Sequence, residues 1–326
     1  MAEPVRHWVA AHVFHRGDQD LLVTGAMAPV CEELTRAGQV AGWFFLRYWE
    51  GGPHVRLRLL ARAPAAGIRS AVVRSCARHL ADHPSPPDAW SQGDYEAVAR
   101  RRAEGERLAK WDRRLRAVDT VEFIAYEPEH HAYGEGRALR AVERHFADSS
   151  RIAVHLLAAP PERRAGAALA MLTLALAVCE PDLERAASRF AAVRTRLPSP
   201  RHHADRRDDL REQTRRLWEH ASSDPADLAR ADVLGAWWRS IRVLHATLTG
   251  LRARGDFAPV DALSPFAGLA RALRPDDAVV PYVVLRCAHL LCNRLGLSAA
   301  TEARLASLTA RTLSELPDHH DEVAPL

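Results

Sequence analysis

The chain has 326 residues, 48% of them hydrophobic and 26% charged, a balance typical of folded globular proteins. Lys110 is the only lysine, so 44 of the 45 basic residues are arginine, and the 41 acids leave a net charge of only +4. This balance argues against a strongly basic nucleic-acid-binding protein, in which positive charge gathers on one face. We attribute the arginine excess to codon usage rather than to a phosphate-binding surface.

Neither end of the chain nor its apolar runs predict a membrane protein. Residues 1–17 lack the apolar core of a signal peptide. The longest apolar run, residues 165–179, is shorter than the roughly 20 residues of a spanning helix, so we expect a buried helix there. The five cysteines lack metal-binding spacing and are odd in number, so we expect reduced core cysteines, no structural metal and a cytoplasmic protein.

The first third of the chain predicts an antiparallel sheet with flanking helices. The expected strands are residues 7–15, 42–49, 54–60 and 118–126, and the expected helices are residues 20–39 and 65–83. The resulting β-α-β-β-α-β order is a ferredoxin-like arrangement, for which we expect residues 1–133 to form the domain. An insertion at about residues 84–115, with a Pro-rich start and an arginine-rich helix, either covers a site or is a solvated helix.

From residue 134 to about 316 the pattern is almost entirely helical, so the fold class is α+β with a large helical C-terminal part packed on the sheet as one domain. The expected helices are residues 137–157, 162–179, 182–195, 206–222, 228–254, 278–295 and 298–315. Residues 317–326 are polar, and we expect a disordered tail.

One expected strand carries a row of basic side chains. Alternation along the strand sends His54, Arg56 and Arg58 to one face of the sheet and the apolar residues between them to the other. Such arginines either face solvent without a function or bind a carboxylate or a carbonyl-rich substrate, because a guanidinium offers rigid paired donors.

A second candidate lies where the last expected strand gives way to a helix. Tyr126 and Glu129 stand at this junction, a frequent location for site residues. The glutamate is either a general base or a charge at the helix N-terminus that interacts with the helix dipole.

A third candidate is a polar stripe on an otherwise apolar helix. Tyr282, Arg286, His289 and Asn293 follow one another in steps of four, three and four residues, which places them on one face. Unpaired buried polar groups cost about 1–3 kcal/mol each, so the stripe forms a hydrogen-bond network or one wall of a site. His289 is the natural proton donor or acceptor at neutral pH. Trp237 and Ser240, on another helix, are a weaker candidate for contacting a peptide.

Several of these segments occur in an order typical of one family. They are residues 42–49 (GWFFLRYW), 52–58 (GPHVRLR), 123–129 (FIAYEPE), 133–134 (YG) and 289–295 (HLLCNRL). Together they resemble the stand-alone C-terminal, or elimination, domain of lantibiotic dehydratases, in the thiopeptide-type bacteriocin biosynthesis family. The resemblance spans about residues 8–313.

The resemblance implies modification of a ribosomally made precursor peptide. One reaction on this fold is β-elimination of glutamate from glutamylated Ser or Thr, which gives dehydroalanine or dehydrobutyrine. The other is the pyridine synthase reaction of thiopeptides, a formal aza-[4+2] cycloaddition of two dehydroalanines with loss of water and leader peptide. A binding-only scaffold for the leader peptide is a third alternative.

The elimination residues of the family carry over in part. Its paired strand arginines match Arg56 and Arg58, its glutamate matches Glu129, and its helix histidine matches His289. A further arginine is expected three residues after the glutamate, where this chain has Ala132. Alanine provides neither charge nor paired donors, so the resemblance favours the pyridine synthase.

For that reaction we expect His289 and Glu129 to transfer protons and Arg56 and Arg58 to polarise carbonyls. Tyr126 and Tyr282 are expected hydroxyl donors, and the expected substrate-binding residues are His54, Arg286, Asn293, Trp237 and Ser240. We expect no cofactor and no metal. The expected partner is the precursor peptide, as leader plus dehydrated, azole-bearing core, with tRNA used only in the upstream glutamylation step; a homodimer stays open.

Overall fold

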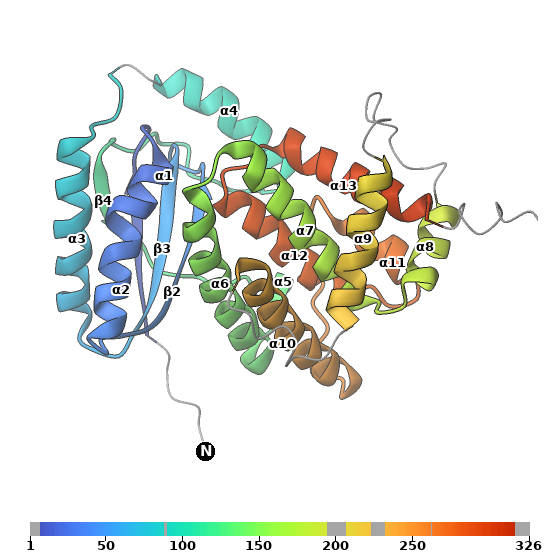
Figure 1. Ribbon diagram of the computed structural model, residues 1–326. Helices are drawn as coiled ribbons and strands as arrows, with labels where there is room; N and C mark the ends of the chain where they lie inside the picture. The colour runs from blue at the N-terminus through green and yellow to red at the C-terminus, as the bar shows by residue number, and fades with distance from the viewer. Residues whose placement is uncertain (1–6, 88–89, 194–206, 223–231, 262, 317–326) are drawn as a thin grey trace, which may run out of the picture. The chain divides into compact units, whose positions relative to one another are not determined.

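The computed structural model describes residues 7–87, 90–193, 207–222, 232–261 and 263–316. The chain divides into two compact units, Met1–Pro128 (unit 1) and Glu129–Leu326 (unit 2). All four strands of the described chain lie in unit 1, and the described elements of unit 2 are helices (Figure 1). The predicted α+β class is therefore confirmed. The predicted tail, residues 317–326, lies outside the described residues.

Unit 1 is built on a four-stranded antiparallel sheet. Its strands are β1 (Trp8–Phe14), β2 (Val40–Tyr48), β3 (His54–Ala61) and β4 (Thr120–Phe123), in the spatial order β2-β3-β1-β4. The predicted hairpin of β2 and β3 turns through Gly51 and Gly52, whose φ angles of 79° and 108° favour glycine. The two central strands, β3 and β1, are neighbours in this order, so residues of one strand stand directly opposite residues of the other.

The alternation predicted for residues 54–60 is present in β3. Val55, Leu57 and Leu59 are fully buried on one face of the sheet. Helices α2 (Ala28–Arg36) and α3 (Ala65–Asp82) pack against each other and against the sheet (Figure 1). The residues between the three apolar ones consequently lie on the opposite face, as a period of two requires.

The helix expected over residues 20–39 is interrupted. It consists of α1 (Gln19–Leu22), a π-helical turn η1 (Val23–Met27) and α2. Pro29 stands in the first turn of α2. Proline lacks an N–H and its ring clashes with the carbonyl four residues before it, so the backbone widens ahead of it.

The strand expected over residues 118–126 is shorter than predicted. Asp119 has a φ of 56°, and the strand β4 begins after it and ends at Phe123. Tyr126 therefore lies beyond the strand, in a segment without regular secondary structure before Pro128. The residue before a proline avoids helical backbone angles, which disfavours a helix at Glu127.

The described part of unit 2 contains the seven helices predicted from the pattern, with shifted ends, and two short ones that were not predicted. They are α5 (His130–Tyr133), α6 (Gly136–Leu157), α7 (Pro161–Cys179), α8 (Leu183–Ala192), α9 (Arg207–Ser222), α10 (Val233–Ala253), α11 (Ala267–Leu273), α12 (Val279–Arg294) and α13 (Ala299–Ser314). The seven-residue α11 lies between Pro265 and Pro275 and is too short for a clear period.

The apolar run of residues 165–179 lies in α7, and most of it is buried, as predicted. Every residue from Ala170 to Cys179 is buried. Among the described residues no single helix is long and apolar enough to cross a membrane, although the bent pair α7 and α8 passes by length and composition alone. All five cysteines are buried and unpaired in the described structure.

Candidate functional site

The basic row on β3 forms a cluster with a histidine of β1. In the antiparallel register His12 stands opposite Arg56, Ala10 opposite Arg58, and Phe14 opposite His54. Side chains directly opposite each other share a face, so His12, His54, Arg56 and Arg58 form one group, here called the basic sheet face. His12 was not among the residues predicted from sequence, because its partner strand is 42 residues or more away along the chain.

Arg58 is the most unusual member of the basic sheet face. Its side chain is only 7% exposed. Its Nη2 donates to His12 Nε2 at 3.0 Å, and its Nη1 lies 3.4 Å from the Leu57 carbonyl oxygen. Within the described part of unit 1, no carboxylate forms an ion pair with it. Burial lowers the pKa of Arg58 to about 10, so the group remains charged at neutral pH.

The two histidines beside Arg58 are neutral. Burial, together with the charge of the neighbouring arginines, lowers the pKa of His12 to about 2 and that of His54 to about 3. His54 Nδ1 lies 2.9 Å from the Gly52 carbonyl oxygen, which can only accept, so Nδ1 carries the hydrogen. The two rings stack at 4.9 Å. Within this group of four side chains, the positive charges are therefore those of the two arginines.

Arg56 is more open than Arg58 and is held from three sides. Its guanidinium lies 3.4 Å from the centre of the Tyr48 ring, and its Nη2 pairs with Glu50 Oε2 at 3.2 Å. Its Nε lies 3.4 Å from His54 Nε2. These contacts fix the guanidinium while the side chain stays 24% exposed, so it can still reach a ligand.

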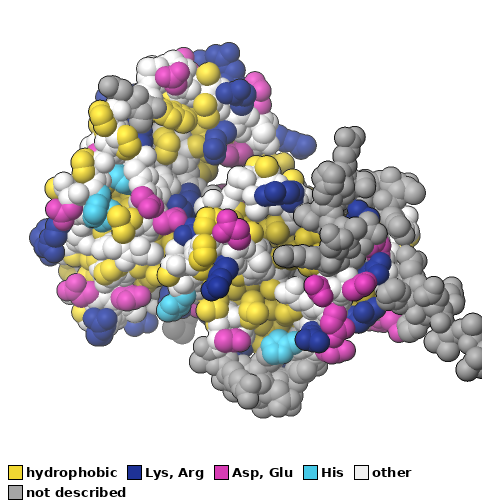
Figure 2. All heavy atoms as spheres, turned by 45° about the horizontal axis from the view of Figure 1, so that its top comes forward, with side chains coloured by type: hydrophobic (Ala, Val, Ile, Leu, Met, Phe, Trp, Pro, Cys, Tyr) yellow, Lys and Arg dark blue, Asp and Glu magenta, His cyan; other side chains and the backbone are white. Residues whose placement is uncertain are grey.

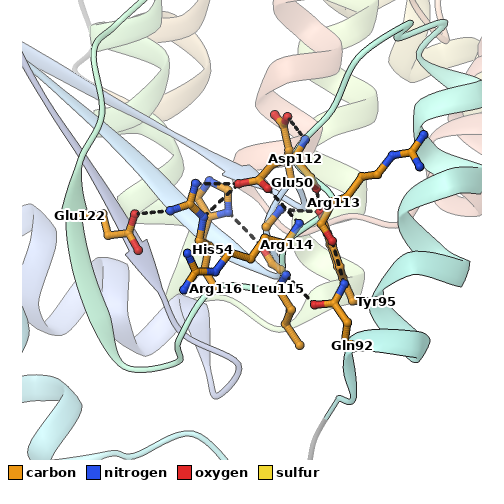
Figure 3. Close-up of polar contacts among 12 residues, drawn as sticks. Glu50, His54, Gln92, Tyr95, Asp112, Arg113, Arg114, Leu115, Arg116 and Glu122 are labelled. Carbon is orange, nitrogen blue, oxygen red and sulfur yellow. Dashed lines mark hydrogen bonds and ion pairs between the residues drawn. The ribbon is translucent and has the colours of Figure 1, made fainter.

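The predicted insertion holds Glu50 in place. Its helix α4 (Gln92–Gly105) packs Tyr95 against Trp49. The Tyr95 hydroxyl accepts from the Gly51 N–H at 2.7 Å and donates to the Asp112 carbonyl oxygen. The Asp112 N–H in turn donates to Glu50 Oε1 at 2.7 Å, as Figure 3 shows. The insertion is therefore docked on the hairpin turn and positions Arg56 through Glu50.

Tyr126 lies near the basic sheet face although it is outside the strand. The Arg58 guanidinium is 5.5 Å from the centre of its ring. The ring packs edge-on against Trp8 at 5.5 Å and Phe44 at 5.9 Å. The structure thus brings together His54, Arg56, Arg58 and Tyr126 within unit 1.

In unit 2, Glu129 and Arg286 meet in a second cluster. Glu129 precedes α5 and its Oε2 lies 3.9 Å from Arg286 Nη2. Arg286 Nη1 forms a shorter bond of 2.8 Å with Asp261, and His131 Nε2 lies 3.8 Å from the same carboxylate. Although burial opposes it, the bond from Arg286 helps lower the pKa of Asp261 below its usual range. Asp261 was missed from sequence because it stands alone in a connecting segment.

His289 has a different partner. Its Nδ1 lies 2.6 Å from Glu302 Oε2 on α13, and Glu302 is buried. Among the described residues, no hydrogen bond or ion pair joins His289 to Glu129. On the same stripe, the hydroxyl oxygen of Tyr282 accepts a hydrogen bond from Arg271 Nε at 3.3 Å. The four stripe residues are partly exposed, whereas the apolar residues between them are buried, Leu290 excepted.

Ser240 lines a hollow between α6 and α10. The hollow has a volume of about 500 Å³, and Arg144 and Arg239 stand among its lining residues. Ser240 Oγ donates to Asp148 at 2.8 Å and lies 2.9 Å from His145 Nδ1. Burial lowers the pKa of His145 to about 3, so its ring is neutral.

Trp237 is placed differently from the prediction. It is fully buried, and its indole N–H donates to the Met171 carbonyl oxygen at 2.9 Å. This position favours a structural role rather than contact with a substrate. Asn293 is partly exposed at the end of the polar stripe.

Ala132 is completely buried in unit 2. It belongs to the short helix α5, and its N–H bonds the Glu129 carbonyl oxygen at 3.0 Å. Arg286, the neighbouring arginine, is already paired with Asp261. The described residues contain no group of three or more His, Cys, Asp or Glu side chains arranged to hold a metal ion.

Comparison with solved structures shows the fold. A pyridine synthase, TbtD, from thiomuracin biosynthesis matches with a TM-score of 0.69 and 20% identity over 95% of this chain and 98% of that chain. The crystal structure of TsrL matches with a TM-score of 0.62 and 19% identity over 96% of each chain. The tRNA-dependent lantibiotic dehydratase MibB from Microbispora sp. 107891 matches at 0.52 and 18%, over 99% of this chain but 29% of that one.

Among curated protein sequences, none matches this chain significantly. A family model for the C-terminal part of lantibiotic biosynthesis dehydratases matches residues 8–313, nearly the whole chain. The resemblance seen in the sequence is thereby confirmed. The chain belongs to the lantibiotic biosynthesis dehydratase C-terminal family.

Proposed function

We propose that this protein is an enzyme of ribosomal peptide maturation that forms the central pyridine of a thiopeptide. Two dehydroalanines of one precursor would undergo a formal aza-[4+2] cycloaddition, which makes two C–C bonds. Loss of water and of the leader peptide as an amide then makes the six-membered ring aromatic. Membership of the family and the fold shared with a pyridine synthase support a maturation enzyme of this kind.

The observation that carries the choice of reaction is the burial of Ala132. Glutamate elimination on this fold is expected to use an arginine at this position, and here a methyl group is enclosed in the core. Arg286 does not replace it freely, because its guanidinium is paired with Asp261 at 2.8 Å. A glutamyl carboxylate would therefore lack one of its expected partners.

In the cycloaddition the two strand arginines would polarise amide carbonyls of the substrate. Arg58 suits this role because it is a buried charge without a carboxylate partner in the described part of unit 1, and a neutral acceptor would satisfy its donors. Tyr126 and Tyr282 would donate hydroxyl hydrogens. Holding the two dehydroalanines in a reactive pose supplies most of the remaining acceleration.

Proton transfer would fall to His289 and Glu129. The amide of one dehydroalanine must lose its N–H proton and gain one on oxygen to become the iminol, and a hydroxyl must later leave as water. His289 is partly exposed, and Glu129 is 52% exposed, so both side chains are open to a substrate. Arg286 would orient Glu129.

The precursor peptide would contact further surfaces. β2 and β4 are the sheet edges, and an extended leader could add a strand to one of them, or lie beside the insertion at about residues 84–115. The hollow that Ser240 lines has arginines around it and suits a core or leader segment with acidic side chains. The sheet layer would be ferredoxin-like, and the reaction would take place in the cytoplasm on the dehydrated, azole-bearing precursor.

Glutamate elimination is the second candidate function. It is favoured by the presence of Arg56, Arg58, Glu129 and His289 at the positions that the family's elimination pattern uses. A leader-binding scaffold without catalysis is the third candidate.

A paired mass-spectrometric assay separates the three. The purified protein is incubated with a precursor bearing azoles and dehydroalanines, and in parallel with a precursor glutamylated on serine. Release of the leader from the first supports the proposal, and dehydroalanine formed from the second supports elimination. Binding of both without turnover would leave the scaffold.

A further inference from the structure

The contact between α12 and α13 places a buried carboxylate on the candidate proton-transfer residue. Glu302 lies in the first turn of α13, and its side chain is 6% exposed. Its Oε2 is 2.6 Å from His289 Nδ1. Among the described residues, no arginine or lysine forms an ion pair with Glu302, so His289 is its only charged or ring partner there.

This geometry dictates where the imidazole carries its hydrogen. A buried carboxylate is costly unless it receives a hydrogen bond, and a carboxylate can only accept. Nδ1 of His289 must therefore be the donor, in the neutral ring as well as in the protonated one. The acid–base chemistry of the ring is then confined to Nε2.

Nε2 is also the atom that remains open. The His289 side chain is 27% exposed, and no described residue forms a hydrogen bond with Nε2. The Cys292 thiol lies one turn further along α12. Burial is the main cause that raises its pKa, and the negative charge of Glu302 adds to this effect. The carboxylate thus faces α12 and contacts the Nδ1 side of the imidazole.

We propose that Glu302 is a positioning residue that fixes His289 as the Nδ1–H tautomer and leaves Nε2 as the proton-transfer atom. The inference rests on the proposed function in assigning the proton transfer to His289. In that step Nε2 accepts the proton from the amide nitrogen and returns it to the carbonyl oxygen, which gives the iminol. After ring closure Nε2–H donates a proton to the hydroxyl oxygen, which leaves as water, and Nε2 regains a proton from the ring carbon at which the new double bond forms. Nδ1–H stays bonded to Glu302 throughout, so the proton count balances.

The tautomer can be measured without any substrate. Nitrogen-15 labelling of the 17 histidines gives one pair of ring signals each, and His289→Gln identifies the pair of His289 by its loss. In the unmodified protein the neutral His289 ring is expected as the Nδ1–H form. Glu302→Ala is expected to introduce the Nε2–H form, whereas Glu302→Gln keeps Nδ1–H because its amide oxygen still accepts.

The rate measurement uses the same variants. Glu302→Ala is expected to lower kcat about 10- to 100-fold with KM within about twofold, and Glu302→Gln to recover part of the loss. The double variant with His289→Gln should be no slower than His289→Gln alone, because Glu302 acts only through the imidazole. Thr301→Ala, one residue away, is the matched control and should leave both signals and rate unchanged.

An Nε2–H ring in the unmodified protein would overturn the inference, even if Glu302→Ala did not fold. So would a Glu302→Ala variant that folds, changes tautomer and keeps full kcat, or an additive loss in the double variant. If neither precursor reacts with the unmodified protein, the proposed function fails, whereas the tautomer result stands on its own.

Discussion

Arg58 combines burial, positive charge and the lack of a carboxylate partner in the described part of unit 1. A buried unpaired charge destabilises the folded state, so this side chain is retained at a cost in stability. Its donors are directed to a neutral histidine and a carbonyl oxygen. Such an arrangement is typical of groups whose partner is a ligand.

Because burial of the Arg58 charge destabilises the folded state, replacing Arg58 should raise stability and lower activity. Arg58→Met fills a similar volume without charge and is expected to raise the free energy of unfolding by about 1 kcal/mol or more while abolishing turnover. Chemical denaturation and the leader-release assay measure the two effects. Arg47→Met, which removes a partner of Asp20 in the same sheet, is the control and should be destabilising. A less stable Arg58→Met protein would contradict this account of Arg58.

Ala132 predicts that elimination cannot be restored by one substitution. Ala132→Arg forces a long charged side chain into a fully buried position and is expected to lower the free energy of unfolding by about 3 kcal/mol or more. His131→Arg, at the neighbouring exposed position, should be tolerated. An Ala132→Arg protein that folds normally and eliminates glutamate would show that the alanine does not decide the reaction.

The buried histidines make the fold sensitive to acid. His54 has a pKa of about 3 when folded against about 6.5 when unfolded, so below pH 6.5 the unfolded chain binds the proton first and stability falls. Its contribution to this loss is about 1 to 2 kcal/mol at pH 5. His54→Asn keeps the donor to Gly52 and should reduce the difference in unfolding free energy between pH 7.5 and pH 5. Phe44→Leu, which removes no titrating group, should lower stability equally at both; an unchanged pH dependence in His54→Asn would contradict the assignment.

At the scale of elements, the insertion is a support for the hairpin rather than an isolated solvated helix. Tyr95 bridges the Gly51 N–H and the Asp112 carbonyl, and through Asp112 the same segment reaches Glu50 (Figure 3). The arginines on the outer side of α4, at residues 100–102, are exposed. The position of Arg56 therefore depends on a segment some 40 to 60 residues further along the chain.

Because the Tyr95 hydroxyl joins the insertion to the hairpin turn, its removal should affect both stability and turnover. Tyr95→Phe leaves the buried Gly51 N–H without its acceptor and is expected to cost about 1–3 kcal/mol of unfolding free energy. It should also lower turnover, because Glu50 loses part of its support. Arg101→Ala on the exposed side of the same helix is the control, with a change within about 0.5 kcal/mol. Equal stability of the two variants would show that the hydroxyl bridge is unimportant.

Local pattern predicted the elements well where one period governed them. Strand alternation placed His54, Arg56 and Arg58 on one face correctly, and the fifteen-residue apolar run marked the buried α7. Predictions failed where backbone geometry intervened: β4 begins only after Asp119, and the helix expected over residues 20–39 is interrupted by the π-helical turn before Pro29. Spacing alone could not find Glu50, His12, Asp261 or Glu302, because each meets its partner through the fold rather than through a sequence period.

At the scale of the molecule, the 44 arginines are mostly background. Figure 2 shows basic and acidic side chains interleaved over the face it presents, consistent with a net charge of only +4. Against that background the informative positions are few. They are Arg58, which forms no ion pair with a carboxylate in the described part of unit 1, Arg286, which is paired with Asp261, and Ala132, where the elimination pattern has an arginine. They belong to the two compact units of the chain.

The central claim is that the protein closes a pyridine rather than eliminating glutamate. The most direct measurement incubates the purified protein with an azole-bearing precursor that carries two dehydroalanines, in the presence of a chelator and with no added cofactor. Mass spectrometry then follows the products. The account predicts a macrocyclic product and free leader peptide carrying a C-terminal amide, in amounts that rise together. An unchanged precursor, alongside dehydroalanine formation from the glutamylated peptide, would contradict it.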